Sequence, residues 1–131
     1  MKKSAQQPKL NREGVPSPQS ETAASFAKFV VLETDTLQTA LLAIDKNLHR
    51  SVVITNAHNV VVGVLSDGDA RKSLLDGRLL STPVHRIMNT DFVSVGLKEL
   101  AKARKLLTQG HIFVIPVVDS HGTLVKVLTS T

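Results

Sequence analysis

The feature that most constrains the fold of this chain is an internal repeat with a period of 63 residues. A shift of 63 positions, without a gap, aligns Phe29 with Phe92, Leu37 with Leu100, Ala40 with Ala103, Ile44 with Leu107, Asn56 with Asp119, His58 with His121 and Val64-Leu65-Ser66 with Val127-Leu128-Thr129. One ungapped register through four successive elements favours duplication over a chance similarity of pattern. We therefore expect two copies of a β-α-β-β unit, joined near Pro83.

The first half of each unit is predicted to be a short strand followed by a helix. Phe29–Leu32 is apolar and strand-like, and Asp35 with Gln38 three residues later is a plausible N-cap pair. One face of the helix that follows is apolar at Leu37, Ala40, Leu41, Ile44 and Leu48. That face is expected to pack on a sheet.

The second half of the unit is predicted to be a hairpin and a further helix. Val52–Thr55 and Val60–Ser66 are β-branched runs, separated by a loop whose asparagines tolerate left-handed turn geometry. Asp67–Leu75 then indicates a helix that ends before Gly77. The expected organisation is a tail over residues 1–28, one repeat over 29–82 and a second over 83–131.

The tail shows no periodicity and is rich in polar residues and proline, so we expect it to be disordered. Of the net charge of +5, this segment carries +3, from five Lys/Arg against two Asp/Glu. The chain has four Phe and no Trp or Tyr on which bases could stack, which argues against nucleic-acid binding.

Cysteine is absent, which excludes disulfides, thiolate metal sites and thiol nucleophiles. Neither a signal-peptide core nor an apolar run long enough to span a bilayer occurs. We expect a soluble, cytoplasmic protein without membrane contact.

Two stretches resemble signatures of the cystathionine-β-synthase (CBS) domain family. Val62-Gly63-Val64-Leu65-Ser66-Asp67-Gly68-Asp69 resembles its strand-to-helix signature, and Val114-Ile115-Pro116-Val117-Val118-Asp119 its hairpin. The segment from Ser66 to Gly77, with Pro83-Val84 and Ile87-Met88-Asn89, is similar to CBS pairs attached to sugar nucleotidyltransferases and arabinose-5-phosphate isomerases. Because a polar tail precedes the pair here, the nucleotidyltransferase arrangement is the better match.

The resemblance implies an α/β (α+β) fold in which two pseudo-twofold-related repeats pack sheet to sheet around clefts for AMP, ADP or ATP. It places Ser66 and Asp69 on the ribose and Gly63 beside the base. Arg71 or Lys72 would lie near phosphate, and Asp67, Val53 and Thr129 are further candidate ligand-binding residues. No cofactor is expected to be required, and dimerisation through the repeats is expected.

Local chemistry is compatible with this site but leaves a second interpretation open. A strand that ends at Ser66 and a helix that starts just after it present free N–H groups to a phosphate, and Arg71 or Lys72 could neutralise its charge. Ser66 and Asp69 equally form an ordinary helix cap. No further carboxylates cluster in sequence near Asp67 and Asp69, so a metal site is not expected.

The second repeat departs from the family pattern. Lys126 stands where the shift predicts a glycine, and the ribose-binding aspartate would fall at position 132, beyond Thr131. The last helix of the repeat is missing as well. The second cleft is therefore expected to be impaired, and the chain is expected to be a piece of a longer protein.

The sequence is compatible with three functions to different degrees. A regulatory adenine-nucleotide-binding module that controls an attached or associated sugar-nucleotide enzyme is favoured, and a ligand-free dimerisation module is the alternative. A free-standing enzyme is disfavoured because no nucleophile-base pair, phosphate loop or metal cluster is found. Among the remaining polar residues, His111 could face a cleft, and Arg50 or Arg86 could reach a phosphate or pair with a neighbouring Asp.

Overall fold

Strands and helices alternate in the order that the repeat predicts in the computed structural model, which describes residues 26–130. The first half contains the 3-10 turn η1 (Ala27–Phe29), β1 (Val30–Leu32), α2 (Leu37–Asn47), β2 (Ser51–Thr55), β3 (Val61–Ser66) and α3 (Asp67–Leu75). After the short turn η2 (Val84–Arg86), the second half contains η3 (Leu97–Glu99), α4 (Leu100–Thr108), β4 (Val114–Val118) and β5 (Leu124–Thr129).

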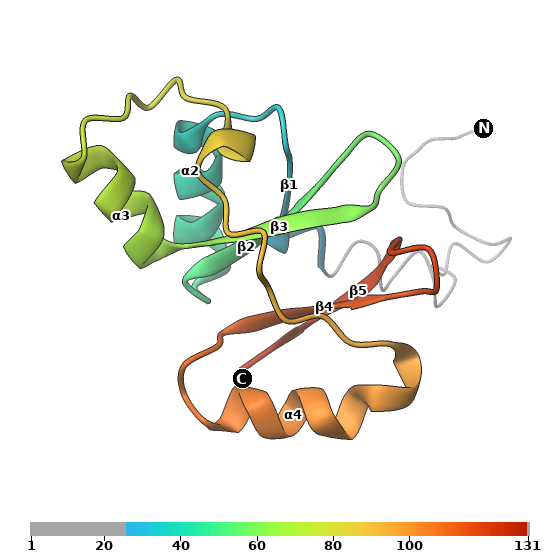
Figure 1. Ribbon diagram of the computed structural model, residues 1–131. Helices are drawn as coiled ribbons and strands as arrows, with labels where there is room; N and C mark the ends of the chain where they lie inside the picture. The colour runs from blue at the N-terminus through green and yellow to red at the C-terminus, as the bar shows by residue number, and fades with distance from the viewer. Residues whose placement is uncertain (1–25, 131) are drawn as a thin grey trace, which may run out of the picture.

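Two sheets face each other between the helices (Figure 1). In the first sheet, β1 runs parallel to β2, and β2 runs antiparallel to β3. The second sheet is the antiparallel pair β4 and β5. The helices α2 and α3 lie on one outer side and α4 on the other (Figure 1). The predicted α+β architecture of two repeats packed sheet to sheet is confirmed.

The two hairpins have the same register when shifted by 63 residues. Val52 pairs with Leu65 and Ile115 with Leu128, and both ladders slip at equivalent points, Ile54/Thr55 and Val117/Val118. The turns also match. The Oδ1 atom of Asn56 accepts hydrogen bonds from the N–H groups of His58 and Val60, and Oδ1 of Asp119 accepts them from His121 and Thr123. The N–H groups of His121 and Thr123 hold the pKa of the Asp119 carboxyl below its usual value.

Equivalent residues of the two halves meet each other, which marks a pseudo-twofold axis. Val60 forms an isolated bridge with Thr123. Around it, the N–H of Val61 donates to Gly122 O at 3.1 Å, and the N–H of Leu124 donates to Asn59 O at 2.9 Å. The apolar layer between the sheets is a cluster of Phe29, Val53, Val61, Val114 and Leu124. This layer is the interface that holds the two repeats together.

Two details of α2 differ from the prediction. Thr36, not Asp35, caps the helix: Thr36 Oγ1 accepts from the Thr39 N–H at 3.2 Å, whereas Asp35 Oδ2 accepts from the Leu32 N–H at 2.8 Å. Leu48 is not on the buried face, because the helix ends at Asn47 and Leu48 takes a left-handed conformation with 83% of its surface exposed. Its neighbour Asn47 is buried instead, where its side-chain amide donates to Ser51 O at 2.9 Å.

The second repeat contains less secondary structure than the first. The counterpart of β1 is reduced to one parallel bridge between Val95 and Val117, and within the described residues no helix follows β5. The core of this repeat is accordingly a smaller cluster around Ile115 and Val117, to which α4 contributes Ala103 and Leu107. The first repeat has a larger core, closed by α2, α3 and Val84.

The described fold begins before the predicted end of the tail. Residues 1–25 of the predicted tail lie outside the described residues. Phe26 packs against the layer between the sheets, and Ala27 and Lys28 belong to η1.

Candidate functional site

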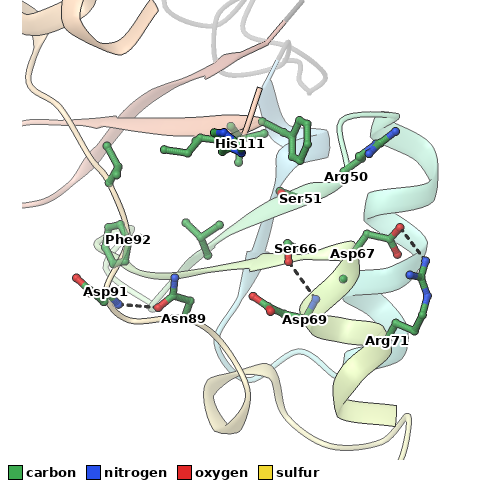
Figure 2. A pocket seen from close by; sticks show the side chains of 16 residues that line it. Arg50, Ser51, Ser66, Asp67, Asp69, Arg71, Asn89, Asp91, Phe92 and His111 are labelled. Atoms are coloured by element: carbon green, nitrogen blue, oxygen red, sulfur yellow. Dashed lines mark hydrogen bonds and ion pairs between the residues drawn. The ribbon is translucent and has the colours of Figure 1, made fainter. Parts of the chain in front are cut away.

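A cavity of about 830 Å³ lies between the two repeats, beside the turn that contains Ser66. Ligand pockets typically measure about 300–1,000 Å³. From the first repeat, its wall is built by Arg50 and Ser51 at the start of β2, Val64 and Ser66 on β3, and the first turns of α3. The second repeat supplies two further stretches: Asn89, Asp91, Phe92 and Val93 from the segment before η3, and His111 to Val114 at the start of β4 (Figure 2). A molecule in this cavity would contact both repeats.

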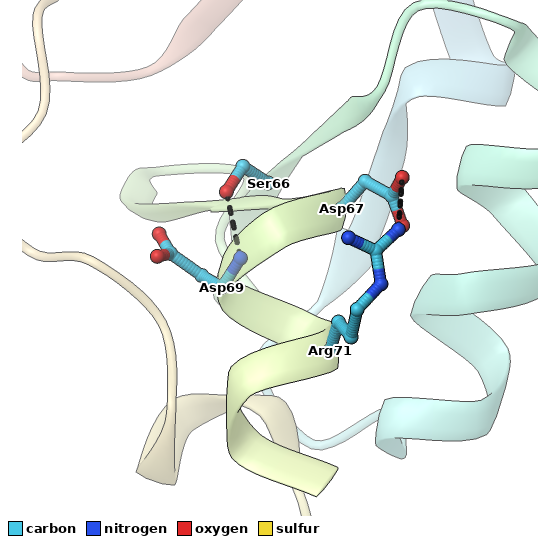
Figure 3. A network of polar contacts seen from close by, with 4 residues as sticks. All are labelled: Ser66, Asp67, Asp69 and Arg71. Carbon is cyan, nitrogen blue, oxygen red and sulfur yellow. Dashed lines mark hydrogen bonds and ion pairs between the residues drawn. The ribbon is translucent and has the colours of Figure 1, made fainter. Parts of the chain in front are cut away.

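The corner between β3 and α3 has the geometry that the sequence predicts. Ser66 has extended backbone dihedral angles and caps α3, and its Oγ accepts from the Asp69 N–H at 3.0 Å (Figure 3). Ser66 therefore caps α3, as the second interpretation of the sequence expects. The cap leaves the hydroxyl hydrogen of Ser66 free to be donated elsewhere. Among residues 26–130 the Asp69 carboxylate has no partner, and it points away from Arg71 (Figure 3).

Asp67 and Arg71 form an ion pair on the exposed side of the same helix. The Arg71 Nη2 atom lies 3.4 Å from Asp67 Oδ2, and the two side chains are 66% and 42% exposed. Both residues line the cavity, so a bound anion would compete with Asp67 for Arg71. Lys72 is exposed on α3 and is not among the residues that line the cavity.

Gly63 does not line the cavity, contrary to the expected position beside a base. A Cβ atom at this position would lie 2.6 Å from the Met88 sulfur and 3.1 Å from Met88 Cβ. Met88 follows η2 and packs against the core of the first repeat. The missing side chain at Gly63 therefore makes room for Met88.

Gly63→Ala is expected to lower the free energy of unfolding by about 1–3 kcal/mol, because the added methyl group overpacks the contact with Met88. Urea titration measures the loss. Combining it with Met88→Ala should recover part of the cost of the glycine substitution, since the two side chains share one space. Unchanged stability together with weaker AMP binding would instead restore the base-binding role of Gly63.

Val53 and Thr129 also lie outside the cavity lining. Val53 is fully buried in the apolar layer between the sheets. Thr129 ends β5, where it pairs with Val114 at the position equivalent to Ser66. Lys126 pairs with Val117 as Gly63 pairs with Ile54, so the second repeat carries a long charged side chain at that position.

Several lining residues were not identified from the sequence, namely Asn89, Asp91, Phe92, Val93, Ile112 and Phe113. Asn89 reaches the cavity because it pairs with the outer edge of β3 through two hydrogen bonds with Val64. A local sequence signal for this segment is Asn-x-Asp, which indicates a turn. Asn89 Oδ1 accepts a hydrogen bond from the Asp91 N–H at 3.0 Å, and the chain changes direction there. His111, expected to face a cleft, and Arg50, expected to reach a phosphate or pair with an Asp, both line the cavity, whereas Arg86 does not.

No group of three or more His, Asp or Glu side chains in residues 26–130 is arranged to hold a metal ion. No helix in that range is long and apolar enough to cross a membrane.

Known proteins resemble this chain in sequence and in fold. The sequence model of the CBS domain family matches residues 27–76. Arabinose 5-phosphate isomerase GutQ from Salmonella typhi is 33% identical over 96 residues, which cover 72% of this chain and 30% of the isomerase. The chain thus spans less than a third of the length of this curated relative.

Solved structures extend the similarity over both repeats. A protein assigned to acetoin utilization (AcuB) from Vibrio cholerae is 31% identical, with a TM-score of 0.64 over 76% of this chain and 75% of that one. A CBS domain protein from Pyrobaculum aerophilum, complexed with AMP, shares the fold at 24% identity, with a TM-score of 0.63 over 76% and 78% of the two chains. Because the family model, the similar solved structures and the repeated hairpin register agree, this chain belongs to the CBS domain family.

Proposed function

We propose that this chain is a regulatory module that binds an adenine nucleotide in the cavity beside Ser66 and controls an attached or associated sugar-nucleotide or sugar-phosphate enzyme. The supporting observation is the cavity itself, whose wall combines the Ser66–Asp69 corner of one repeat with His111 to Val114 of the other. AMP is the nucleotide named for the Pyrobaculum protein of the same fold, which makes it the first ligand to test.

The two polar groups of the corner suit the ribose. The Asp69 carboxylate can accept hydrogen bonds from the two ribose hydroxyls, and the Ser66 hydroxyl can donate one to a ribose oxygen. Neither role disturbs the helix cap, which uses only a lone pair of Ser66 Oγ and the backbone of Asp69. Capping and ligand binding are therefore compatible at this turn.

The remaining wall includes apolar and cationic groups. Val64, Phe92, Val93 and Ile112 offer an apolar surface for a purine ring. Arg50 and Arg71 lie on the side of α2 and α3, where a phosphate group would find guanidinium partners (Figure 2). Backbone N–H groups at the start of α3 add positive potential in the same region.

Regulation follows from the position of the cavity between the repeats. A ligand that contacts both repeats favours the arrangement in which those contacts are made, and shifts the population by its difference in affinity for the two arrangements. An enzyme connected to one repeat would respond to that shift. We propose a sugar nucleotidyltransferase as the enzyme that this module controls. The alternative is an arabinose-5-phosphate isomerase, which the GutQ relative supports.

AMP is expected to stabilise the chain by about 2.7 kcal/mol when it is present at about a hundred times its dissociation constant. Thermal denaturation with and without AMP, read together with calorimetric titration, measures both quantities. Inorganic phosphate at the same concentration is the control, because it tests for simple anion binding. A denaturation midpoint that AMP leaves unchanged, with no heat of binding, contradicts the proposal.

A second candidate function is a ligand-free dimerisation module. Four exposed leucines favour it: Leu74, Leu75, Leu79 and Leu80, on α3 and the segment after it, with Leu75 81% exposed. Several exposed apolar side chains within one short segment are consistent with a contact site. A stable dimer in sedimentation equilibrium, combined with no response to AMP, would select this function over nucleotide sensing.

A further inference from the structure

The charges around the cavity limit how much negative charge a ligand can bring. Three carboxylates line it, those of Asp67, Asp69 and Asp91, against two guanidinium groups, those of Arg50 and Arg71. Of the two guanidinium groups, Arg71 already has Asp67 as its partner at 3.4 Å. Arg50 is thus the cation of this wall whose charge no described carboxylate compensates.

Arg50 is held in place by contacts from both repeats. Its carbonyl oxygen accepts a hydrogen bond from the Asp67 N–H at 2.7 Å, which fixes its backbone to the start of α3. Its guanidinium carbon lies 5.3 Å from the centre of the Phe113 ring, within cation–π range. A positioned guanidinium gives up less freedom when it binds an anion than a free one does.

Asp67 lies at the same end of the cavity as Arg50 and Arg71 (Figure 2). The pair with Arg71 is largely exposed, and such pairs are weak, so a polyphosphate could draw Arg71 away. The negative charge of Asp67 would nevertheless remain beside the phosphates. A phosphate held by Arg50 would leave a second or third phosphate group close to this carboxylate.

We infer that this cavity selects a nucleotide with one phosphate group over nucleotides with two or three, with Arg50 as the phosphate partner and Asp67 as the residue that sets this limit. The inference rests on the proposed function, since it names the ligand class of the same site. It assigns to Asp67 a role in specificity and not in affinity for the nucleoside.

The test is calorimetric titration of the 131-residue chain with adenosine, AMP, ADP and ATP, at low ionic strength and with a chelator to remove divalent cations. AMP is expected to bind about tenfold more tightly than ATP, a factor that corresponds to about 1.4 kcal/mol. The difference in affinity between AMP and ATP should become smaller as salt is added, because salt screens exposed charges.

Two substitutions separate the roles of the residues. Asp67→Asn removes the carboxylate and releases Arg71, so it should reduce the preference for AMP over ATP to about twofold or less. Asp76→Asn makes the same charge change at the other end of α3, outside the cavity, and should keep the preference. Arg50→Gln should lower the affinity for AMP toward that for adenosine, while the affinity for adenosine stays the same.

The outcomes distinguish the inference from the proposed function. ATP binding as tightly as AMP to the unsubstituted chain overturns the inference and leaves nucleotide binding intact. An equal effect of Asp67→Asn and Asp76→Asn also overturns it, because the preference would then reflect net charge and not the local carboxylate. Failure of all four compounds to bind overturns the proposed function, and the inference with it.

Discussion

Leu37→Ala is expected to lower the free energy of unfolding by about 2–5 kcal/mol, the range for large-to-small substitutions in a packed core. Leu37 has no exposed surface. The segment after α3 folds back over the start of α2 and covers it: the N–H of Leu37 donates to Thr82 O at 2.8 Å, and the N–H of Gln38 donates to Leu80 O at 3.0 Å. These contacts hinder the collapse of the space that the substitution would leave.

The equivalent residue of the second repeat provides a matched control. Leu100 begins α4 as Leu37 begins α2, but it is only partly buried at the edge of its cluster. Leu100→Ala should therefore cost clearly less, and urea titration of both variants measures the difference. An equal loss for the two would show that the segment after α3 contributes nothing to the core of the first repeat.

The fold could be predicted to the extent that it depends on short-range patterns. The repeat was visible because hairpins need particular residues at fixed points, such as Asn56 and Asp119 in the turns. Two signals in the sequence conflict at the end of α2, because Asn47 is suited to a helix C-terminus while the apolar spacing runs on. Leu48 continues the apolar spacing of the helix, but Asn47 ends it, because the Asn47 side chain satisfies backbone groups at Ser51 and His49.

The site could be predicted only where one stretch of sequence builds it. The Ser66–Asp69 corner is local, so its cap could be derived from residue types alone. Asn89 enters the cavity because it pairs with Val64 of another element, and residue types in one stretch of sequence do not predict such a pairing. Gly63 is the opposite case. It belongs to a stretch that resembles a family signature, but the space beside it is filled by Met88, a residue 25 positions away.

Residues of both repeats line the cavity beside Ser66. The cavity takes its polar corner from the first repeat and part of its apolar wall from the second. A substitution in Ile112 or Phe113 can therefore alter ligand binding without touching Ser66 or Asp69.

Asp69→Ala is expected to weaken AMP binding about ten- to a hundredfold, because charge-assisted hydrogen bonds to the ribose hydroxyls contribute about 1.5–3 kcal/mol. Calorimetric titration measures the change. Asp76→Ala, at the C-cap of the same helix and outside the cavity, is the control and should bind AMP as the unsubstituted chain does. Removing Asp69 also takes a negative charge from the first turn of α3, which should cost about 0.3–1 kcal/mol of stability, measured without ligand. That loss alone, with AMP affinity unchanged, would limit the Asp69 side chain to stabilising the helix.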